Sequence, residues 1–334
     1  MNFATEYLGL NLRNPLVASA GPMTQSATGI KKLAEAGVGA VVLPSLFEEQ
    51  IRREAERDTQ LAEAGTESFR EALTYIPDPG ADIWPRRYLG LIEQATGEAG
   101  VPVIASLNGV TAGGWTDYAA AVERAGAAAI ELNIYYLPSD PLVPAREAEQ
   151  RYVDVLTAVK AVVKIPVAVK LTPYFSSFGE MAVTLDNAGA DGLVLFNRFM
   201  QTDIDPDTLT VSAGFKLSSP AEAALPRSWI TSMRGRVKAS LAASTGVESA
   251  ADVAAYLLAG ADVVMTTSAL LRHGPDHVTV LLDGLTAWME RKGFNSVDKV
   301  RGLLAPAAGE DRSAYGRIGY LTAVEQATRT YGPR

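Results

Sequence analysis

The chain of 334 residues contains no cysteine. This absence excludes disulfide bonds, cysteine-ligated metal clusters, an iron–sulfur relay within the chain and a cysteine acting as nucleophile or base. Histidine is scarce too, because the chain has only His273 and His277. A histidine-rich metal site is therefore not expected, and His273 is interpreted as a residue on a helix face rather than a base.

Long apolar runs and an excess of positive charge are also missing. No apolar stretch reaches the roughly 18 residues that span a bilayer, and the first residues lack the basic-then-apolar pattern of a secretion signal. We therefore expect a cytoplasmic protein with no membrane partner. The formal net charge of -8 argues against nucleic acid as the main partner.

The sequence does contain a repeated junction between a helix and a strand. An Ala-Gly pair followed by an apolar run occurs at residues 36–43, 125–132, 188–195 and 259–266. In each copy a helical pattern ends at a glycine suited to the left-handed cap, and an apolar strand follows within about three residues. Residues 99–106 and 163–170 are variants with a proline at the strand start.

Eight strands are expected from these junctions and the remaining apolar runs. They fall at residues 16–20, 40–44, 103–107, 129–133, 167–171, 192–197, 237–243 and 262–267. Strands that alternate with helices in this number predict an α/β fold, a (β/α)8 TIM barrel whose active site lies at the carboxyl ends of the strands. An open doubly wound sheet is the alternative, but no Gly-x-Gly-x-x-Gly motif follows the first strand.

The segments outside this alternation complete the expected architecture. Residues 7–12 are expected to form a short N-terminal hairpin that closes the barrel floor. Residues 1–304 are interpreted as one barrel domain, with an insertion at 202–236 between strands 6 and 7, and residues 305–334 as a C-terminal surface extension. The insertion carries alternating aspartates but lacks the glycine and distal glutamate of a calcium loop, so no metal site is expected.

A lysine interrupts one of the most apolar predicted strands. Lys170 lies near the carboxyl end of residues 167–171. A buried ammonium there is costly unless an anionic or electron-rich group meets it, and a ligand at the barrel mouth would be such a group. The alternative is that the side chain simply extends into solvent at the strand end.

Small and polar residues follow the other predicted strands on the same side of the barrel. They include Ala20, Gly21, Asn108, Asn133, Asn197, Thr245, Gly246, Thr267 and Ser268. Three asparagines beside one positive charge suit a planar ligand with many heteroatoms. The two last loops, rich in Ser, Thr and Gly and each leading into a helix, predict a phosphate cradle. Ordinary helix capping explains any one of these residues, but their coincidence at one barrel face favours a binding site.

These motifs, in this order, resemble the dihydroorotate dehydrogenases. The most specific part is Pro-Val-Ala-Val-Lys-Leu-Thr-Pro-Tyr-Phe at residues 166–175, supported by residues 14–21, 131–133 and 257–261. The resemblance implies an FMN-binding barrel in which Lys170 stabilises the anionic reduced flavin. It also implies that Asn108, Asn133 and Asn197 contact flavin or substrate and that Gly246, Thr267 and Ser268 hold the phosphate. Ala20, Gly21, Ser45 and Thr245 complete the expected cofactor site.

Departures from the family concern the substrate side. After Glu-Leu-Asn the family has a loop with a Cys or Ser base, whereas this chain has Ile-Tyr-Tyr-Leu-Pro at residues 134–138, which puts Tyr136 at the base position. Tyr136, or its neighbour Tyr135, is the candidate acid/base. Ser45 lies where the family has a second-strand lysine, and residues 74–79 lie where the family has an asparagine-rich loop that binds orotate.

One further stretch has two interpretations. Residues 47–71 are dense in glutamate and arginine, and opposite charges three and four positions apart fit an exposed helix. A lid over the flavin is the alternative.

The sequence therefore predicts an FMN-dependent oxidoreductase that transfers a hydride from a small anionic CH–CH donor to flavin. The donor is dihydroorotate, as in pyrimidine biosynthesis, or a different substrate. Two alternatives stay open: a Schiff-base lyase with Lys170 as nucleophile, and a flavin-binding barrel without turnover. The expected partners are the small-molecule substrate, an external electron acceptor of unknown kind and, as one option, a second copy of the chain.

Overall fold

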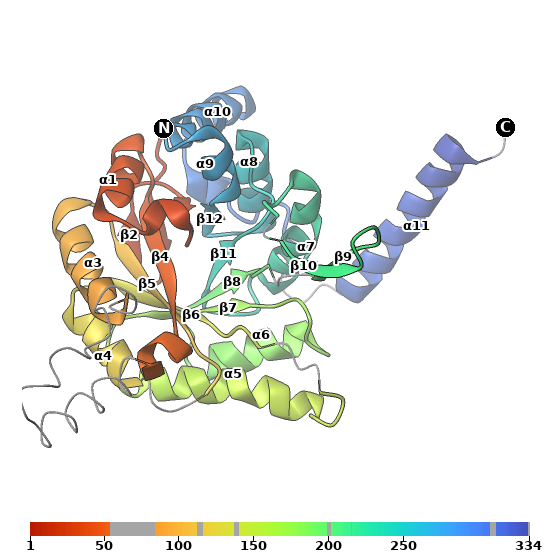
Figure 1. Cartoon of the computed structure of the whole chain (residues 1–334). Coiled ribbons are helices and arrows are strands. Elements are labelled where there is room, and N and C mark those ends of the chain that lie inside the picture. Colours follow the sequence, from red (N-terminus) through yellow and green to blue (C-terminus); the bar gives the residue numbers. More distant parts are fainter. Residues whose placement is uncertain are drawn as a thin grey trace, which may run out of the picture.

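The computed structural model describes residues 1–53, 84–111, 116–136, 140–198, 202–214, 216–307 and 312–332. Within these residues eight parallel strands close into a barrel (Figure 1). In order around the barrel the strands are β3 (Leu16–Ala18), β4 (Ala40–Phe47), β5 (Val103–Asn108), β6 (Ala129–Asn133), β7 (Val167–Leu171), β8 (Gly192–Leu195), β11 (Ser240–Ala243) and β12 (Val263–Thr266). The predicted TIM barrel is confirmed, and the open sheet is wrong because β12 pairs with β3.

Helices surround this barrel on the outside (Figure 1). They are α1 (Ala27–Ala36), α3 (Trp84–Glu98), α4 (Thr116–Arg124), α5 (Ala145–Lys160), α6 (Phe178–Asn187), α7 (Ala224–Met233), α8 (Ala250–Ala259), α9 (Ser268–His273) and α10 (His277–Lys292). At the four Ala-Gly repeats, Gly37, Gly126, Gly189 and Gly260 adopt positive φ as expected for left-handed caps. In the described part of the chain, none of the helices has both the length and the apolarity to cross a membrane.

The two faces of each barrel strand have different surroundings. In β6, Ile130 and Leu132 pack outward into the core shared with the helices, whereas Ala129 packs into a second cluster inside the barrel. Because side chains alternate along a strand, Glu131 and Asn133 lie on the same inward face as Ala129. The barrel interior therefore changes from apolar to polar towards the carboxyl ends of the strands.

A hairpin closes the opposite end of the barrel, as predicted. Strands β1 (Thr5–Tyr7) and β2 (Leu10–Leu12) pair in antiparallel fashion, and Leu8 between them is buried in the inner cluster. The Leu8 amide donates to Ser240 Oγ over 3.1 Å. A Cβ added at Gly192 would lie 2.4 Å from Leu8 Cδ2, so the first residue of β8 has to be a glycine for this leucine to fit.

Two further elements lie outside the barrel. Strands β9 (Thr202–Asp205) and β10 (Thr210–Ala213) form a separate antiparallel hairpin in the insertion. In that hairpin Asp203 pairs with Lys216 at 2.8 Å, and Asp205 accepts hydrogen bonds from the amides of its own turn. Helix α11 (Arg312–Tyr331) projects from the barrel in Figure 1, and its described side chains are almost all exposed. The division at residue 304 stays a prediction.

The packing of the floor hairpin can be tested by comparing one buried and one exposed leucine. Leu8 and Leu209 both have positive φ, 55° and 52°, but Leu8 is 3% exposed and Leu209 is 87% exposed. We expect Leu8→Ala to lower the free energy of unfolding by about 2–5 kcal/mol, because it leaves a cavity in the inner cluster. Leu209→Ala should change it by less than about 0.5 kcal/mol. Urea denaturation measures both, and equal effects would contradict a packed floor.

Candidate active site at the carboxyl ends of the barrel strands

A chain of hydrogen bonds connects four polar side chains at the barrel mouth. Ser45 Oγ lies 2.8 Å from Ser106 Oγ, which joins β4 to β5. Asn133 Nδ2 donates to Ser45 Oγ over 3.3 Å, and Asn197 Nδ2 donates to Asn133 Oδ1 over 2.7 Å. The structure thus brings Ser45, Asn133 and Asn197 together in one network, as the sequence predicts, with Ser106 as an additional member.

Lys170 lies inside the barrel beside this network and does not simply extend into solvent. Its Nζ lies 3.2 Å from Glu131 Oε1, and the two side chains are 10% and 1% exposed. Lys170 and Asn133 are paired residues of β7 and β6. Within the described part of the chain, Glu131 Oε2 is buried without a hydrogen-bond partner. The lysine ammonium has three N–H groups, and Glu131 accepts a hydrogen bond from it.

A pocket of about 330 Å³ opens next to Asn108 at the end of β5. Its lining residues are Phe47, Glu49, Asn108, Gly109, Val110, Tyr135 and Tyr136. Asn108 is only 6% exposed. The predicted acid/base Tyr136 and the predicted ligand contact Asn108 therefore share one pocket, whose aromatic walls suit a planar ring.

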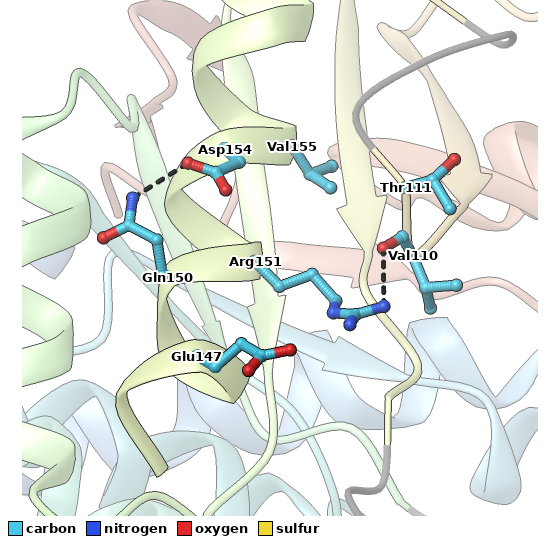
Figure 2. Close-up of a pocket in the computed structure, with 7 residues that line it drawn as sticks. All are labelled: Val110, Thr111, Glu147, Gln150, Arg151, Asp154 and Val155. Atoms are coloured by element: carbon cyan, nitrogen blue, oxygen red, sulfur yellow. Dashed lines mark hydrogen bonds between the residues drawn. The ribbon is translucent and has the colours of Figure 1, made fainter. Parts of the chain in front are cut away.

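Arg151 on α5 supports Tyr136 from a second pocket. The guanidinium carbon of Arg151 lies 4.1 Å from the centre of the Tyr136 ring, and Nη1 donates to the Val110 carbonyl over 3.3 Å. Figure 2 shows the side chain reaching from α5 to Val110 across a pocket of about 400 Å³. Arg151 was not predicted, because no feature of its sequence separates it from the other charged residues of an outer helix.

The two predicted phosphate loops meet through a serine that the sequence analysis did not single out. Ser218 Oγ donates to Ser268 Oγ over 3.0 Å and accepts from the Gly246 amide over 3.3 Å. Gly246 has a φ of 71°, and an added Cβ would lie 2.8 Å from Ala223 Cβ. The insertion thus packs directly on Gly246, and Thr245 precedes it with a φ of 83°.

Two arginines hold this part of the insertion in place. Arg272 Nη2 donates to the Ser218 carbonyl over 2.7 Å, and Arg198 donates to Glu222 over 3.0 Å. Glu248 accepts from both Arg272 and His273. Burial raises the pKa of Glu248, but the hydrogen bonds from His273 and Arg272 lower it more. The pKa of this carboxyl group therefore lies below its ordinary value. His273 lies on α9 and faces Glu248.

The ends of β3 and β12 are packed so closely that a glycine is needed. An added Cβ at Gly21 would lie 2.5 Å from Thr267 Cγ2. Thr267 Oγ1 donates to the Ser19 carbonyl over 2.9 Å and to the Ala20 carbonyl over 3.4 Å. The predicted residues Ala20, Gly21 and Thr267 are therefore in direct contact.

The glutamate- and arginine-rich stretch differs in part from the predicted exposed helix. Residues 48–53 are helical, but Glu48 is only 3% exposed. It pairs with Arg52 and accepts from the Val110 and Thr111 amides over 2.9 and 3.2 Å. A carboxylate inside a charged run thus fixes the loop after β5. The rest of this stretch, residues 74–79 and residues 137–138 lie outside the described residues.

Together, the fold and these contacts define a (β/α)8 barrel with a polar binding site at the carboxyl ends of its strands. Residues 2–289 match the family model described as dihydroorotate dehydrogenase, and the chain belongs to this family. Family members are flavin-dependent oxidoreductases, so the predicted family and enzyme class are confirmed.

Several relatives resemble the chain over most of its length. It is 29% identical over 306 residues to the catalytic subunit of dihydroorotate dehydrogenase B (NAD(+)) of Methanothermobacter thermautotrophicus, covering 90% of this chain and 97% of that one. The corresponding subunit of Methanocella arvoryzae is 29% identical over 299 residues, covering 88% and 95%. A putative dihydroorotate dehydrogenase A (fumarate) of Aeropyrum pernix is 30% identical over 225 residues, covering 64% and 70%.

The contact between Gly21 and Thr267 gives a test of the site's packing. We expect Gly21→Ala to destabilise the protein by about 1–3 kcal/mol, because the new methyl group overlaps Thr267 Cγ2. Thr267→Ser keeps the hydroxyl group but removes that carbon, so the double variant Gly21→Ala/Thr267→Ser should recover most of the loss. The free energy of unfolding in urea is the measurement. No recovery in the double variant would show that the strain lies elsewhere.

Proposed function

We propose that this chain binds FMN at the barrel mouth and oxidises a small anionic CH–CH donor. The observation that carries the proposal is the position of Lys170, whose ammonium lies inside the barrel next to the asparagine network. Flavins have a ring edge rich in nitrogen and oxygen, which amide groups and an ammonium can meet. Bound FMN supplies a two-electron acceptor at this place.

The residues present fit an FMN molecule at both of its ends. Asn108 is buried and lines the pocket, so its side-chain amide can meet a ring bound there. At the other end, Gly246 and Ser268 approach each other around Ser218. Hydroxyl groups and backbone amides that converge in this way suit a phosphate.

The side chains around this site have different roles in the proposed reaction. Lys170 stabilises negative charge on the ring when the ring is reduced. Tyr136 is the acid or base at the substrate pocket, and Arg151 holds its ring in position. Arg151 donates to the Val110 carbonyl through Nη1 and lines the second pocket, so its other N–H groups can attract an anionic donor. The external electron acceptor and a homodimer stay predictions.

The ion pair also argues against the lyase alternative. A Schiff base requires a neutral amine that attacks a carbonyl group. Lys170 Nζ is instead held by Glu131 Oε1 at 3.2 Å, in a buried ion pair that a Schiff base would have to break. No feature of the described residues favours a barrel without turnover over an oxidoreductase.

The first test of this proposal is the charge of Lys170. The purified protein, alone or after adding FMN, should show a flavin absorption band, and Lys170→Met should lower the reduction potential of the bound flavin. The lower potential corresponds to a loss of about 1–4 kcal/mol in the stabilisation of the reduced flavin, which is the Coulomb energy of a partly buried charge pair. Lys160→Met is the matched control, because Lys160 pairs with Asp191 near the start of β8. A colourless protein that takes up no FMN would refute the proposal.

The second test concerns the substrate. We expect dihydroorotate to reduce the bound flavin very slowly or not at all. A phenol keeps its proton at neutral pH, which withholds most of the roughly 10²–10⁴-fold that base catalysis supplies. Ser45 also cannot pair with the substrate carboxylate as a lysine would, which lowers the binding free energy by about 1.5–3 kcal/mol.

Anaerobic mixing followed at the flavin band measures this reduction. Rapid bleaching by dihydroorotate would make Tyr136 a competent base after all. In that case Tyr136→Phe should abolish the bleaching and leave the flavin bound.

A further inference from the structure

The buried partner of Lys170 has no role in the proposed function so far. We propose that the negative charge of Glu131 limits the positive field of Lys170 at the cofactor and so sets the reduction potential of bound FMN. This inference rests on the proposed FMN site. It makes Glu131 a positioning residue that acts through Lys170.

The carboxylate is in the right place for this role. Glu131 Oε1 lies 3.2 Å from Lys170 Nζ on the neighbouring strand, and Glu131 is 1% exposed. Its second oxygen, Oε2, has no hydrogen-bond partner among the residues that the structure describes. A buried carboxylate with an unused oxygen is costly to keep. Its position beside Lys170 indicates that the carboxylate serves to offset the positive charge of the lysine.

Among the described residues, the surroundings of the pair offer Lys170 no second negative charge. Below it, the barrel interior is apolar, with Ala168 and Val194 on β7 and β8 in the inner cluster. At the mouth, Ser45, Ser106 and Asn133 on β4, β5 and β6 are uncharged. Glu131 therefore supplies the negative charge that offsets the buried ammonium.

Other titratable groups near the pair do not replace Glu131. Burial, and then the charges of Glu131 and Asp262, raise the pKa of Tyr7 on the floor hairpin well above its usual value, so Tyr7 stays neutral. Burial likewise raises the pKa of Tyr88, whose hydroxyl group bonds the Ser106 backbone. Asp262 is paired with Arg234 at 2.9 Å and lies 3.4 Å from Arg301.

Removal of the carboxylate has a consequence of known sign. The positive field of Lys170 is no longer offset by Glu131, so reduced FMN is stabilised more than in the wild type. The variant should therefore have a higher reduction potential than the wild type.

The experiment compares the full-length wild type and Glu131→Gln, both loaded with FMN, by spectroelectrochemical titration between about pH 6 and 9. At pH 6 the preference for reduced over oxidised FMN should be about tenfold greater in the variant than in the wild type. This difference equals a rise of about 30 mV in the reduction potential of a two-electron couple. In the Lys170→Met background, adding Glu131→Gln should change the potential much less, because the effect acts through Lys170. Asp191→Asn, which removes the carboxylate of the Lys160 pair, should leave the potential unchanged.

The outcomes separate this inference from the proposed function. A wild type that binds no FMN refutes the FMN site itself. A Glu131→Gln variant that binds FMN with the wild-type potential across the pH range overturns the role of Glu131 alone. If Glu131→Gln does not fold, Glu131→Asp takes its place, because the shorter side chain moves the carboxylate away from Lys170 Nζ. This variant should also favour reduced FMN more than the wild type does, and a wild-type potential would overturn the inference.

Discussion

Two opposite charges inside a parallel barrel are the constraint on which the rest of this molecule depends. Lys170 and Glu131 are both nearly inaccessible to water, and neither would be tolerated there alone. The pair lies at the level where the interior changes from the apolar cluster around Val17 and Ala168 to the serine and asparagine network. Below it the hairpin seals the barrel, and above it the polar network faces the mouth. A binding site for a planar, polar ring follows from this gradient.

The fold was largely predictable because its signals are local. The Ala-Gly junctions place the starts of β6 and β8 at their predicted residues, since each glycine ends a helix and the next strand begins a few residues later. The predicted strand at residues 237–243 begins only at Ser240 in the structure. The reason is a contact distant in sequence: Asp186 accepts from the Lys238 and Ala239 amides, which are therefore not in the ladder. Such competition from another element cannot be deduced from a strand's own sequence.

The candidate site was predictable where it uses strand ends and unpredictable where other elements contribute. Ser45, Asn133 and Asn197 lie at or near the carboxyl ends of the alternate strands β4, β6 and β8, so their meeting follows from the barrel itself. Ser218 comes from the insertion and Arg151 from an outer helix, and each reaches the site through a contact more than 20 residues away in sequence. Neither residue type is unusual in its local context. The departures at Ser45 and Tyr136 lie on the substrate side, whereas the residues that would hold a cofactor come together.

The central claim is that one end of the site holds a flavin ring and the other its phosphate. Titration of flavin-free protein with FMN and with riboflavin, followed by flavin fluorescence, tests both parts directly. The account predicts that FMN binds with one molecule per chain and that riboflavin, which has the ring but no phosphate, binds at least about tenfold more weakly, since a charged hydrogen-bond partner contributes about 1.5–3 kcal/mol. Equal affinity for the two compounds, or no binding of either, would contradict it.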